Sequence, residues 1–431
     1  MKPRRANLWV WVPVGLLALL VAMALALYCV ARAVLAPLPG EWSMPLKVGP
    51  VHMQAGVPTL IRLATAPWAG PLLQGRIVPT RAGRVHLGWW APRQMLTVRC
   101  APCRVQAPGL GKDPLTLEDV QITVRRRGDQ LEGAVIAGKL QATWQGELAR
   151  DKLRLRLQLP MSQVADGYAL FSAAIPETAQ ARIEGRFALQ ASLVLPGGNL
   201  SVVPQVEGLQ VSGLGTEALA TARSACGKNA SRLTTSSWLA RAVVAAEDQR
   251  FYEHAGFDLT ELTASLARNQ GSGPAGRIER GGSTLSQQLA KLLVTGSERS
   301  PVRKLRELLY AVEMERTLGK PRILQLYLAH APWGPGLCGA EAASRHYFGR
   351  AAHELTPTQA AWLAAMLHNP GLEARRWAET GQINVARTQW VILAMRPMPS
   401  RQRIRLAEEA TRLAWPAPAA VPGGKPELLS N

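Results

Sequence analysis

Apolar and polar residues alternate along residues 37–215. The alternation is clearest at Val120–Val124, Leu140–Trp144 and Leu153–Leu159, and residues typical of turns separate these runs. A period of two directs successive side chains to opposite faces of a strand. The pattern therefore predicts a β-rich domain over residues 37–215, built on an antiparallel sheet with one polar face.

Helical spacing replaces this alternation over residues 216–400. Leucines recur at intervals of three and four between Leu305 and Val312, after a Ser300-Pro301 step in which Ser can cap a helix and Pro can occupy its first turn. An alanine-rich stretch follows Thr356-Pro357 in the same way. We expect an α-helical domain here and a loose tail over residues 401–431, which is rich in Pro and Gly.

The N-terminus begins with the basic residues Lys2, Arg4 and Arg5 and continues as an uncharged apolar run from Leu8 to Ala31. A helix of this length can cross a hydrocarbon core of about 30 Å, and the basic cluster should stay in the cytoplasm. The apolar core of a cleaved signal peptide, the alternative, is usually only about 7–15 residues long. Residues 1–36 are therefore expected to form a cytoplasmic tip and a single-pass transmembrane anchor.

Charge and cysteine content fit a protein outside the cytoplasm. The chain has 50 Lys and Arg against 30 Asp and Glu, a formal net charge of +20. Such an excess attracts anionic partners, and for an exported domain these are membrane and phosphate groups rather than nucleic acid. Cys100 and Cys103 are expected to form a local disulfide, and Cys226 and Cys338 could form another.

Two stretches of the helical segment concentrate polar residues next to apolar helices. In Glu247–Asp258 a carboxylate leaves an apolar helix, so partial desolvation can raise its pKa and suit it to proton transfer. In Arg280–Lys291 two glycines precede hydroxyl residues at a helix start, where free amides can bind phosphate or sugar. The structural alternatives are a capped helix end with surface ion pairs and an ordinary flexible cap.

A third stretch is basic. Arg299, Arg303 and Glu307 recur every four residues and share a helix face, with Lys304 and Arg306 nearby. This arrangement could clamp a diphosphate. The alternative is a solvated face whose Arg303–Glu307 pair contributes only about 0.3–0.5 kcal/mol.

Taken together and in this order, the three stretches resemble the peptidoglycan glycosyltransferases, the domain shared by class A penicillin-binding proteins and monofunctional transglycosylases. The resemblance covers roughly Ser237–Pro370 and includes Tyr347-Phe348-Gly349. It implies a mostly helical, lysozyme-like fold that polymerises lipid II into glycan strands with inversion. It also implies a bacterial cytoplasmic membrane protein with its bulk on the periplasmic side.

The resemblance assigns roles by position. Glu247 resembles the general base that deprotonates the acceptor hydroxyl, and Glu307 resembles the second catalytic acid near the leaving diphosphate. No cofactor is required, although a divalent cation, Mg²⁺ or Mn²⁺, could bind near Glu307. The implied substrate-binding positions are Phe251, His254, Ser283, Thr284, Gln287, Gln288, Lys291, Arg299, Arg303 and Lys304.

Partners and alternatives follow from the same reading. The expected partners are lipid II, the growing glycan strand, the membrane and envelope proteins that dock on the β-rich domain. No Ser-x-x-Lys or Lys-Thr-Gly motif of a transpeptidase occurs, so the enzyme would be monofunctional. Leu292, Gln325 and Ala329 depart from the family pattern, which leaves a catalytically weak or inactive scaffold as one alternative. A glycan-cleaving enzyme is the other, but it would have no diphosphate to bind.

Overall fold

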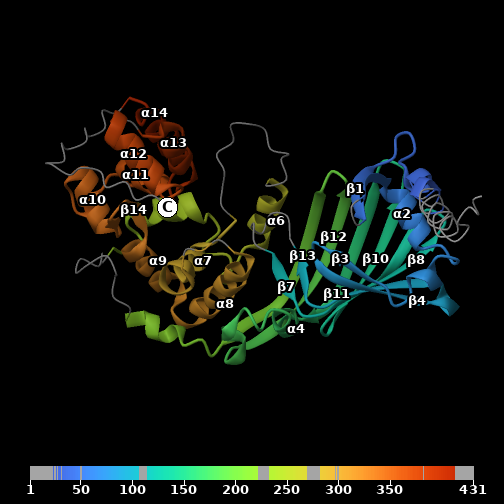
Figure 1. Cartoon of the computed structure of the whole chain (residues 1–431). Helices are drawn as coiled ribbons and strands as arrows, with labels where there is room; N and C mark the ends of the chain where they lie inside the picture. The colour runs from blue at the N-terminus through green and yellow to red at the C-terminus, as the bar shows by residue number, and fades with distance from the viewer. Residues whose placement is uncertain are drawn as a thin grey trace, which may run out of the picture. The chain divides into compact units, whose positions relative to one another are not determined.

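The computed structural model describes residues 23, 26, 28–30, 32–48, 51–105, 114–221, 233–268, 282–296, 298, 300–381 and 383–412. The chain divides into two compact units (Figure 1). The first comprises residues 1–104, 116–160 and 189–202, and the second comprises residues 105–115, 161–188 and 203–431. Within the described ranges, no helix is long and apolar enough to span a bilayer. The apolar run Leu8–Ala31 lies mostly outside these ranges.

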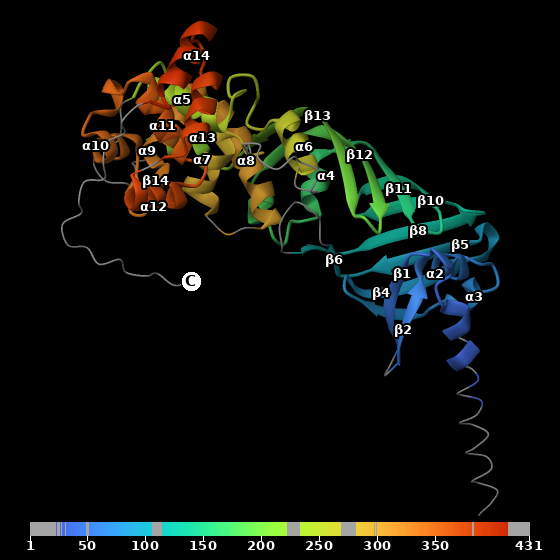
Figure 2. The same ribbon diagram turned by 90° about the horizontal axis from the view of Figure 1, so that it is seen from above.

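A long twisted sheet makes up most of the first unit, and the ends of three of its strands are assigned to the second (Figure 2). Nine strands lie in the order β13-β12-β11-β10-β9-β8-β5-β4-β3, and the neighbours from β3 to β11 pair antiparallel. The expected antiparallel sheet is therefore confirmed. The strands are β3 Ile77–Thr80, β4 Gly83–Trp90, β5 Met95–Cys100, β8 Val120–Arg127, β9 Gln130–Ala137, β10 Leu140–Leu148, β11 Leu153–Gln163, β12 Arg182–Leu195 and β13 Asn199–Ser212.

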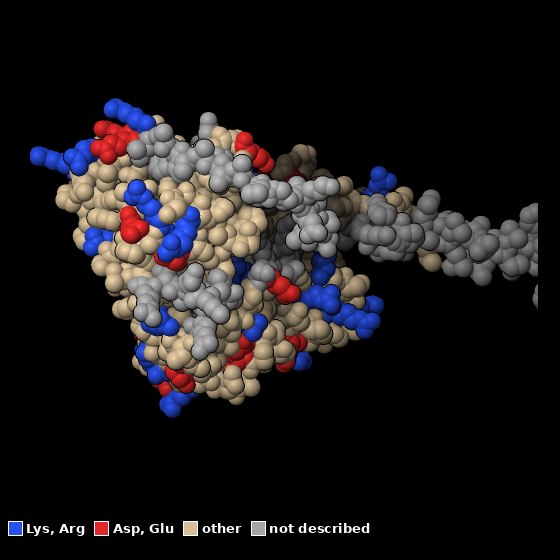
Figure 3. Space-filling view, turned by 90° about the vertical axis from the view of Figure 1, so that its left-hand side faces the viewer, with Lys and Arg blue, Asp and Glu red and all other residues tan. Residues whose placement is uncertain are grey.

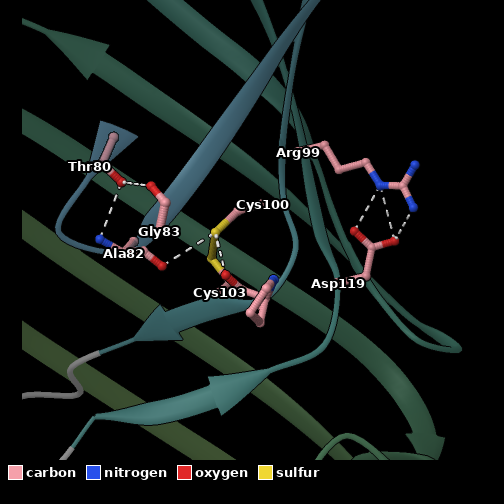
Figure 4. Close-up of a disulfide and its surroundings, with 8 residues drawn as sticks. Thr80, Ala82, Gly83, Arg99, Cys100, Cys103 and Asp119 are labelled. Atoms are coloured by element: carbon pink, nitrogen blue, oxygen red, sulfur yellow. Dashed lines mark hydrogen bonds and ion pairs between the residues drawn. A yellow bond between two sulfur atoms is a disulfide. The ribbon is translucent and has the colours of Figure 1, made fainter. Parts of the chain in front are cut away.

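Short elements border this sheet. Helix α2 packs its Ile61 against the small apolar cluster of Leu131, Leu148 and Leu153. The expected disulfide between Cys100 and Cys103 is confirmed, and it lies at the end of β5 beside the Arg99–Asp119 ion pair (Figure 4). The bordering elements are β1 Ser43–Val48, β2 Val51–Gly56, α2 Val57–Ala64, α3 Gly70–Leu73, β6 Cys103–Val105 and β7 Leu115–Leu117.

The second unit is helical. Alanine-rich α11 is buried almost throughout and packs against α5 and α13, because its small side chains permit close approach on every side. The helices are α4 Val164–Ala169, α5 Trp238–Glu247, α6 Leu259–Arg268, α7 Leu285–Ala290, α8 Pro301–Thr317, α9 Gly319–His330, α10 Ala340–Phe348, α11 Pro357–Met366, α12 Pro370–Thr380, α13 Val385–Ala394 and α14 Ser400–Glu409, with the short hairpin β14 Pro332–Gly334 and β15 Leu337–Cys338.

Caps define the helix starts as the sequence predicted. The Ser300 hydroxyl accepts a hydrogen bond from the Arg303 amide, and Pro301 opens α8. Thr356 and Gln359 form a capping box at the start of α11. The residues after 400 differ from the expected tail, because they continue as α14, whose Ala407 is buried in the helical core.

Residues 161–188, expected to belong to the β-rich domain, fold with the helical unit instead. Tyr168 on α4 and Ile175 pack with Leu309 and Val312 of α8 in one apolar cluster, and the Tyr168 hydroxyl donates to the Leu305 carbonyl at 3.1 Å. Alternation in the sequence could not show this, because it reports which faces are apolar and not what covers them.

Glu177 adds a polar clamp to this contact. It is buried, and its Oε1 accepts hydrogen bonds from Nε and Nη2 of Arg306 at 2.8 and 2.6 Å. Burial acts to raise the pKa of Glu177, but the hydrogen bonds and charge of Arg306 outweigh it and hold that pKa below its ordinary value. Arg306 is therefore engaged on the side of α8 that faces residues 161–188.

We expect Glu177→Ala to lower the free energy of unfolding by about 2 kcal/mol, because it removes charge-assisted hydrogen bonds from a buried site. Urea unfolding at pH 7 measures this. Glu184→Ala, which breaks an exposed pair with Arg182 in the same region, should cost less than about 1 kcal/mol. Since the folded-state pKa of Glu177 is lowered, its contribution is present above its ordinary pKa and disappears as pH falls through the lowered value. Equal losses in the two variants would contradict this account.

Candidate active site

Glu247 is the last residue of α5 and is held by hydrogen bonds on one side only. Its Oε2 accepts from the Gln288 amide at 3.1 Å, and Gln288 is itself oriented by the Tyr327 hydroxyl, which donates to it at 3.0 Å. The other oxygen, Oε1, is buried and has no hydrogen-bond partner among the described residues. The carboxylate thus keeps one oxygen available for a proton.

Burial raises the pKa of Glu247 above its ordinary value. The Gln288 hydrogen bond and the positive charge of Arg387 act in the opposite direction, whereas the negative charge of Asp248 adds to the increase. A carboxylate with a raised pKa and an unused oxygen has the properties of a general base.

A small pocket of about 20 Å³ lies beside this carboxylate. Glu247 and the residues just before α7, Ser283 and Thr284, line it, with Glu261 and Trp390 among the other walls. A space of this size holds roughly one water molecule. The structure therefore brings the first two chemistry-bearing stretches of the sequence to one point.

The third stretch forms a cation cluster on the first turns of α8. Glu307 is fully buried, with Arg303 ion-paired to its Oε1 and the Lys304 ammonium 2.6 Å from its Oε2. Lys304 also lies 2.6 Å from the Ser283 hydroxyl. Contacts thus run from the pocket beside Glu247, through Ser283 and Lys304, to Glu307.

Burial and the like charges of Arg303 and Lys291 lower the pKa of Lys304 to about 8. Among the described residues, the Glu307 carboxylate thus contacts two cations. Both oxygens of Glu307 are engaged by these cations. In the described part of the chain, no group of three or more His, Cys, Asp or Glu is placed to hold a metal ion.

Asp248 joins α5 to α7. It is buried at the end of α5, and its Oδ2 accepts the Leu285 amide at 2.9 Å and lies 3.0 Å from Nε2 of His254. The Gly256 amide donates to Nδ1 of the same ring, which indicates that Nε2 carries the proton and donates to Asp248. One carboxylate thus fixes both the start of α7 and the loop after α5.

Gly256 brings this loop against α8. Its φ is +96°, and a Cβ there would lie 2.8 Å from the backbone carbonyl of Ala311. Both the backbone conformation and the close approach therefore require glycine. The Thr284 hydroxyl donates to the Gly256 carbonyl at 2.7 Å, so the loop, α7 and α8 share one junction.

Several implied substrate-binding residues are structural in this arrangement. Phe251 is completely buried with the Lys320 ammonium 4.4 Å from its ring centroid, and the His254 side chain is buried against Asp248. Thr284 and Gln287 form the capping box of α7, so the amides at the start of that helix are already bonded. Phe251 and His254 thus support the site from the protein interior, whereas Thr284 also lines the pocket beside Glu247.

The other residues expected to bind substrate lie in several different places. Gln288 contacts Glu247, whereas Ser283, Arg303 and Lys304 belong to the cation cluster. Lys291 is exposed at the end of α7, near enough to Lys304 to affect its pKa. Arg299 lies outside the described residues, and so does Cys226 of the second expected disulfide.

Sequence reasoning missed four residues that act on the site: Asp248, Lys320, Tyr327 and Arg387. Asp248 was visible beside Glu247, but nothing in the sequence distinguished an inward carboxylate from a solvated one. Tyr327 and Arg387 lie far along the chain and reach Glu247 only through packing, with Arg387 buried in α13. The departures from the family pattern fall elsewhere: Leu292 packs on the core, and Ala329 is buried in α9.

The basic charge of the chain is not gathered into one patch on the face of the molecule shown in Figure 3. There, Lys and Arg form several small separate groups, with Asp and Glu among them, on a surface formed largely by other residues. The concentration of cations in the site comes from local packing around Glu307.

We expect Asp248→Asn to destabilise the helical unit by about 2 kcal/mol, since it removes a charged acceptor from a buried junction. Glu253→Gln, which affects only an exposed pair with Arg250, is the matched control and should change stability by less than about 1 kcal/mol. Thermal unfolding followed by circular dichroism measures both. A neutral effect of Asp248→Asn would show that the junction does not depend on this carboxylate.

Comparison with known proteins agrees with this site. Residues 218–396 match the family model described as Transglycosylase. A biosynthetic peptidoglycan transglycosylase of Thiobacillus denitrificans is 45% identical over 162 residues, which are 38% of this chain and 66% of that protein. Proteins of the same name from Nitrosomonas eutropha and Chromobacterium violaceum are 47% and 49% identical over 135 and 132 residues, each 31% of this chain and respectively 54% and 57% of those proteins.

The chain thus spans little more than half of the length of two of these relatives, and 66% of the third. The matched residues include both acids, the α7 motif and the cation cluster, all of which the helical unit brings together. The family expected from the motifs is confirmed for this part of the molecule. Residues 218–396 of this chain belong to the transglycosylase family.

Proposed function

We propose that the chain is a membrane-anchored, monofunctional peptidoglycan glycosyltransferase that polymerises lipid II into glycan strands with inversion. The observation that carries this proposal is the pairing of two unlike groups across Ser283. On one side is a partly buried glutamate with a raised pKa and a buried oxygen without a described hydrogen-bond partner, and on the other is a cluster in which two cations contact one carboxylate. The family match and the names of the relatives support it.

Glu247 acts as the base in this mechanism. Its unused Oε1 accepts the proton of the acceptor sugar's 4-hydroxyl group. As the proton leaves, the oxygen of that hydroxyl group attacks the anomeric carbon of the donor. Burial makes the carboxylate a stronger proton acceptor than an exposed glutamate, and the Gln288 amide keeps its other oxygen in place. Such a base typically contributes about 10²–10⁴-fold to the rate.

The cation cluster stabilises the leaving group. As the anomeric C–O bond breaks, negative charge develops on the departing diphosphate, and Lys304 and Arg303 provide positive charge fixed in advance. Glu307 touches both cations and is itself fully buried, so we assign it the role of holding them in place. This gives a physical content to the role that the resemblance implies, a second catalytic acid near the leaving diphosphate.

Location and partners extend the same proposal. The apolar run at Leu8–Ala31 anchors the chain in the inner membrane, with both units on the periplasmic side, where lipid II and the growing strand are found. The first unit serves as a docking module for envelope proteins.

We expect the purified, detergent-solubilised chain to form glycan strands from lipid II and Glu247→Gln to lose at least about 10²-fold in rate, because the amide cannot accept the proton. Glu307→Gln should also lose most activity, by releasing its two cations. Glu253→Gln is the control and should retain full activity. Gel electrophoresis of labelled glycan products measures all four proteins.

A wild-type protein that is folded and binds lipid II but makes no polymer would contradict the enzyme proposal and favour the scaffold. Release of soluble sugars from preformed glycan, lost in Glu247→Gln, would instead favour a hydrolase.

The raised pKa of Glu247 predicts the pH profile. The base must be deprotonated, so kcat/KM should fall on the acidic side at a pH above the ordinary glutamate pKa of about 4.3. Gln288→Leu removes a hydrogen bond that favours the charged form, so the acidic limb should move up by about one pH unit. Tyr327→Phe should shift it less, and Tyr310→Phe, whose hydroxyl contacts Glu177 instead, should leave it unchanged. An acidic limb that stays in place in Gln288→Leu would argue against Glu247 as the titrating base.

A further inference from the structure

The inner face of the sheet in the first unit lines an open cavity of about 490 Å³. Its walls come from strands β5 and β8 to β13, and Ile61 of α2 contributes at one side. This volume falls within the range of small-molecule sites in proteins. Representative lining residues are Val98, Ile122, Val135, Trp144, Leu155 and Leu193.

The described residues of the first unit leave this space unfilled. Val98, Ile122 and Leu155 are only half-buried, although they face inward on strands of a long sheet. The fully buried apolar clusters of this unit are small: one comprises Cys100, Cys103 and Val120, and the other lies under α2. A contiguous apolar surface left open to water is unusual unless it binds something.

The residues that line the cavity indicate which class of ligand it can bind. The inward-facing residues are aliphatic apart from Trp144, whose indole N–H already donates to the Thr123 carbonyl at 3.1 Å. Arg156 and Ser192 also border the cavity, but both are exposed and alternate with the inward residues along their strands. A sugar, nucleotide or peptide would lose hydrogen bonds to water there without replacement, whereas a hydrocarbon chain would lose none.

Charge indicates which lipid would supply that chain. Over residues 37–104, 116–160 and 189–202, the first unit has sixteen Lys and Arg against seven Asp and Glu. A basic unit attracts anionic headgroups at a membrane surface. The apolar run Leu8–Ala31 ends shortly before β1, so a chain anchored through it would carry this unit close to the bilayer.

We propose that the cavity binds the hydrocarbon chain of an anionic phospholipid, with the headgroup outside among the basic residues. The site lies wholly within the first unit and does not depend on the glycosyltransferase activity of the second. The β-rich unit is thereby a lipid-binding module in its own right.

Trp144 provides the readout. The full-length protein in detergent is titrated with phosphatidylglycerol carrying brominated acyl chains, which quench tryptophan on contact. The fluorescence difference between wild type and Trp144→Phe isolates the contribution of Trp144 from those of the other tryptophans. We expect most of this contribution to be quenched, saturably, and restored by unbrominated phosphatidylglycerol.

Three variants make the test specific, each compared with its own Trp144→Phe double variant. Leu155→Glu places a charge in the cavity, and Ala191→Phe fills it without a charge. Both should abolish the quenching of Trp144. Gln158→Glu, exposed on the other face of the same strand, should leave it intact. Circular dichroism shows whether each variant is folded. If Leu155→Glu does not fold, the result for Ala191→Phe alone tests whether the cavity binds the acyl chain.

The outcomes separate the alternatives. Equal quenching in Ala191→Phe and wild type would mean contact with the micelle only, and would overturn the proposal. An unquenched Trp144 in the wild type would overturn it too, and would indicate that protein covers the face. Equal saturation by brominated phosphatidylcholine would overturn the choice of an anionic headgroup.

Discussion

The buried carboxylate of Asp248 is the constraint on which the helical unit depends most directly. It accepts the first amide of α7 and the imidazole N–H of His254, so one side chain connects the end of α5, the following loop and the start of α7. A buried carboxylate without these donors would be strongly destabilising, and the donors are therefore held where it needs them. Glu247 is the preceding residue, and this arrangement fixes its backbone.

Helix α8 carries two sets of charged residues on different faces. Arg303 and Lys304 surround Glu307, whereas Arg306 points to Glu177 from residues 161–188. Helical periodicity separates the two sets although they are adjacent in sequence. Helix α8, which carries the cation cluster, is thus supported by residues 161–188. This segment lies outside the family match and contributes to the stability of the site.

The two units differ in how completely their apolar residues are covered. In the helical unit, small residues on α11 allow neighbouring helices to close around a core that contains Trp333 and Trp362. In the first unit, the inner face of the sheet is apolar, and among the described residues it remains partly open, with the short helix α2 over one part of it. Closed packing suits a site that must hold charges at fixed distances, and an open apolar face suits a flexible hydrocarbon ligand.

The sequence by itself determined the classes of structure and the family. Periodicity is a local property, so alternation at Leu153–Leu159 and capping at Ser300 and Thr356 predicted the sheet and the helix starts correctly. Motif order brought Glu247, Gln288 and Lys304 into one hypothesis. Only the tertiary structure decided that Phe251 and His254 lie behind the site, that Glu307 is locked by two cations, and that Glu177 and Arg387 act from distant segments. Burial and partnership depend on contacts between residues far apart in the chain, which no local pattern encodes.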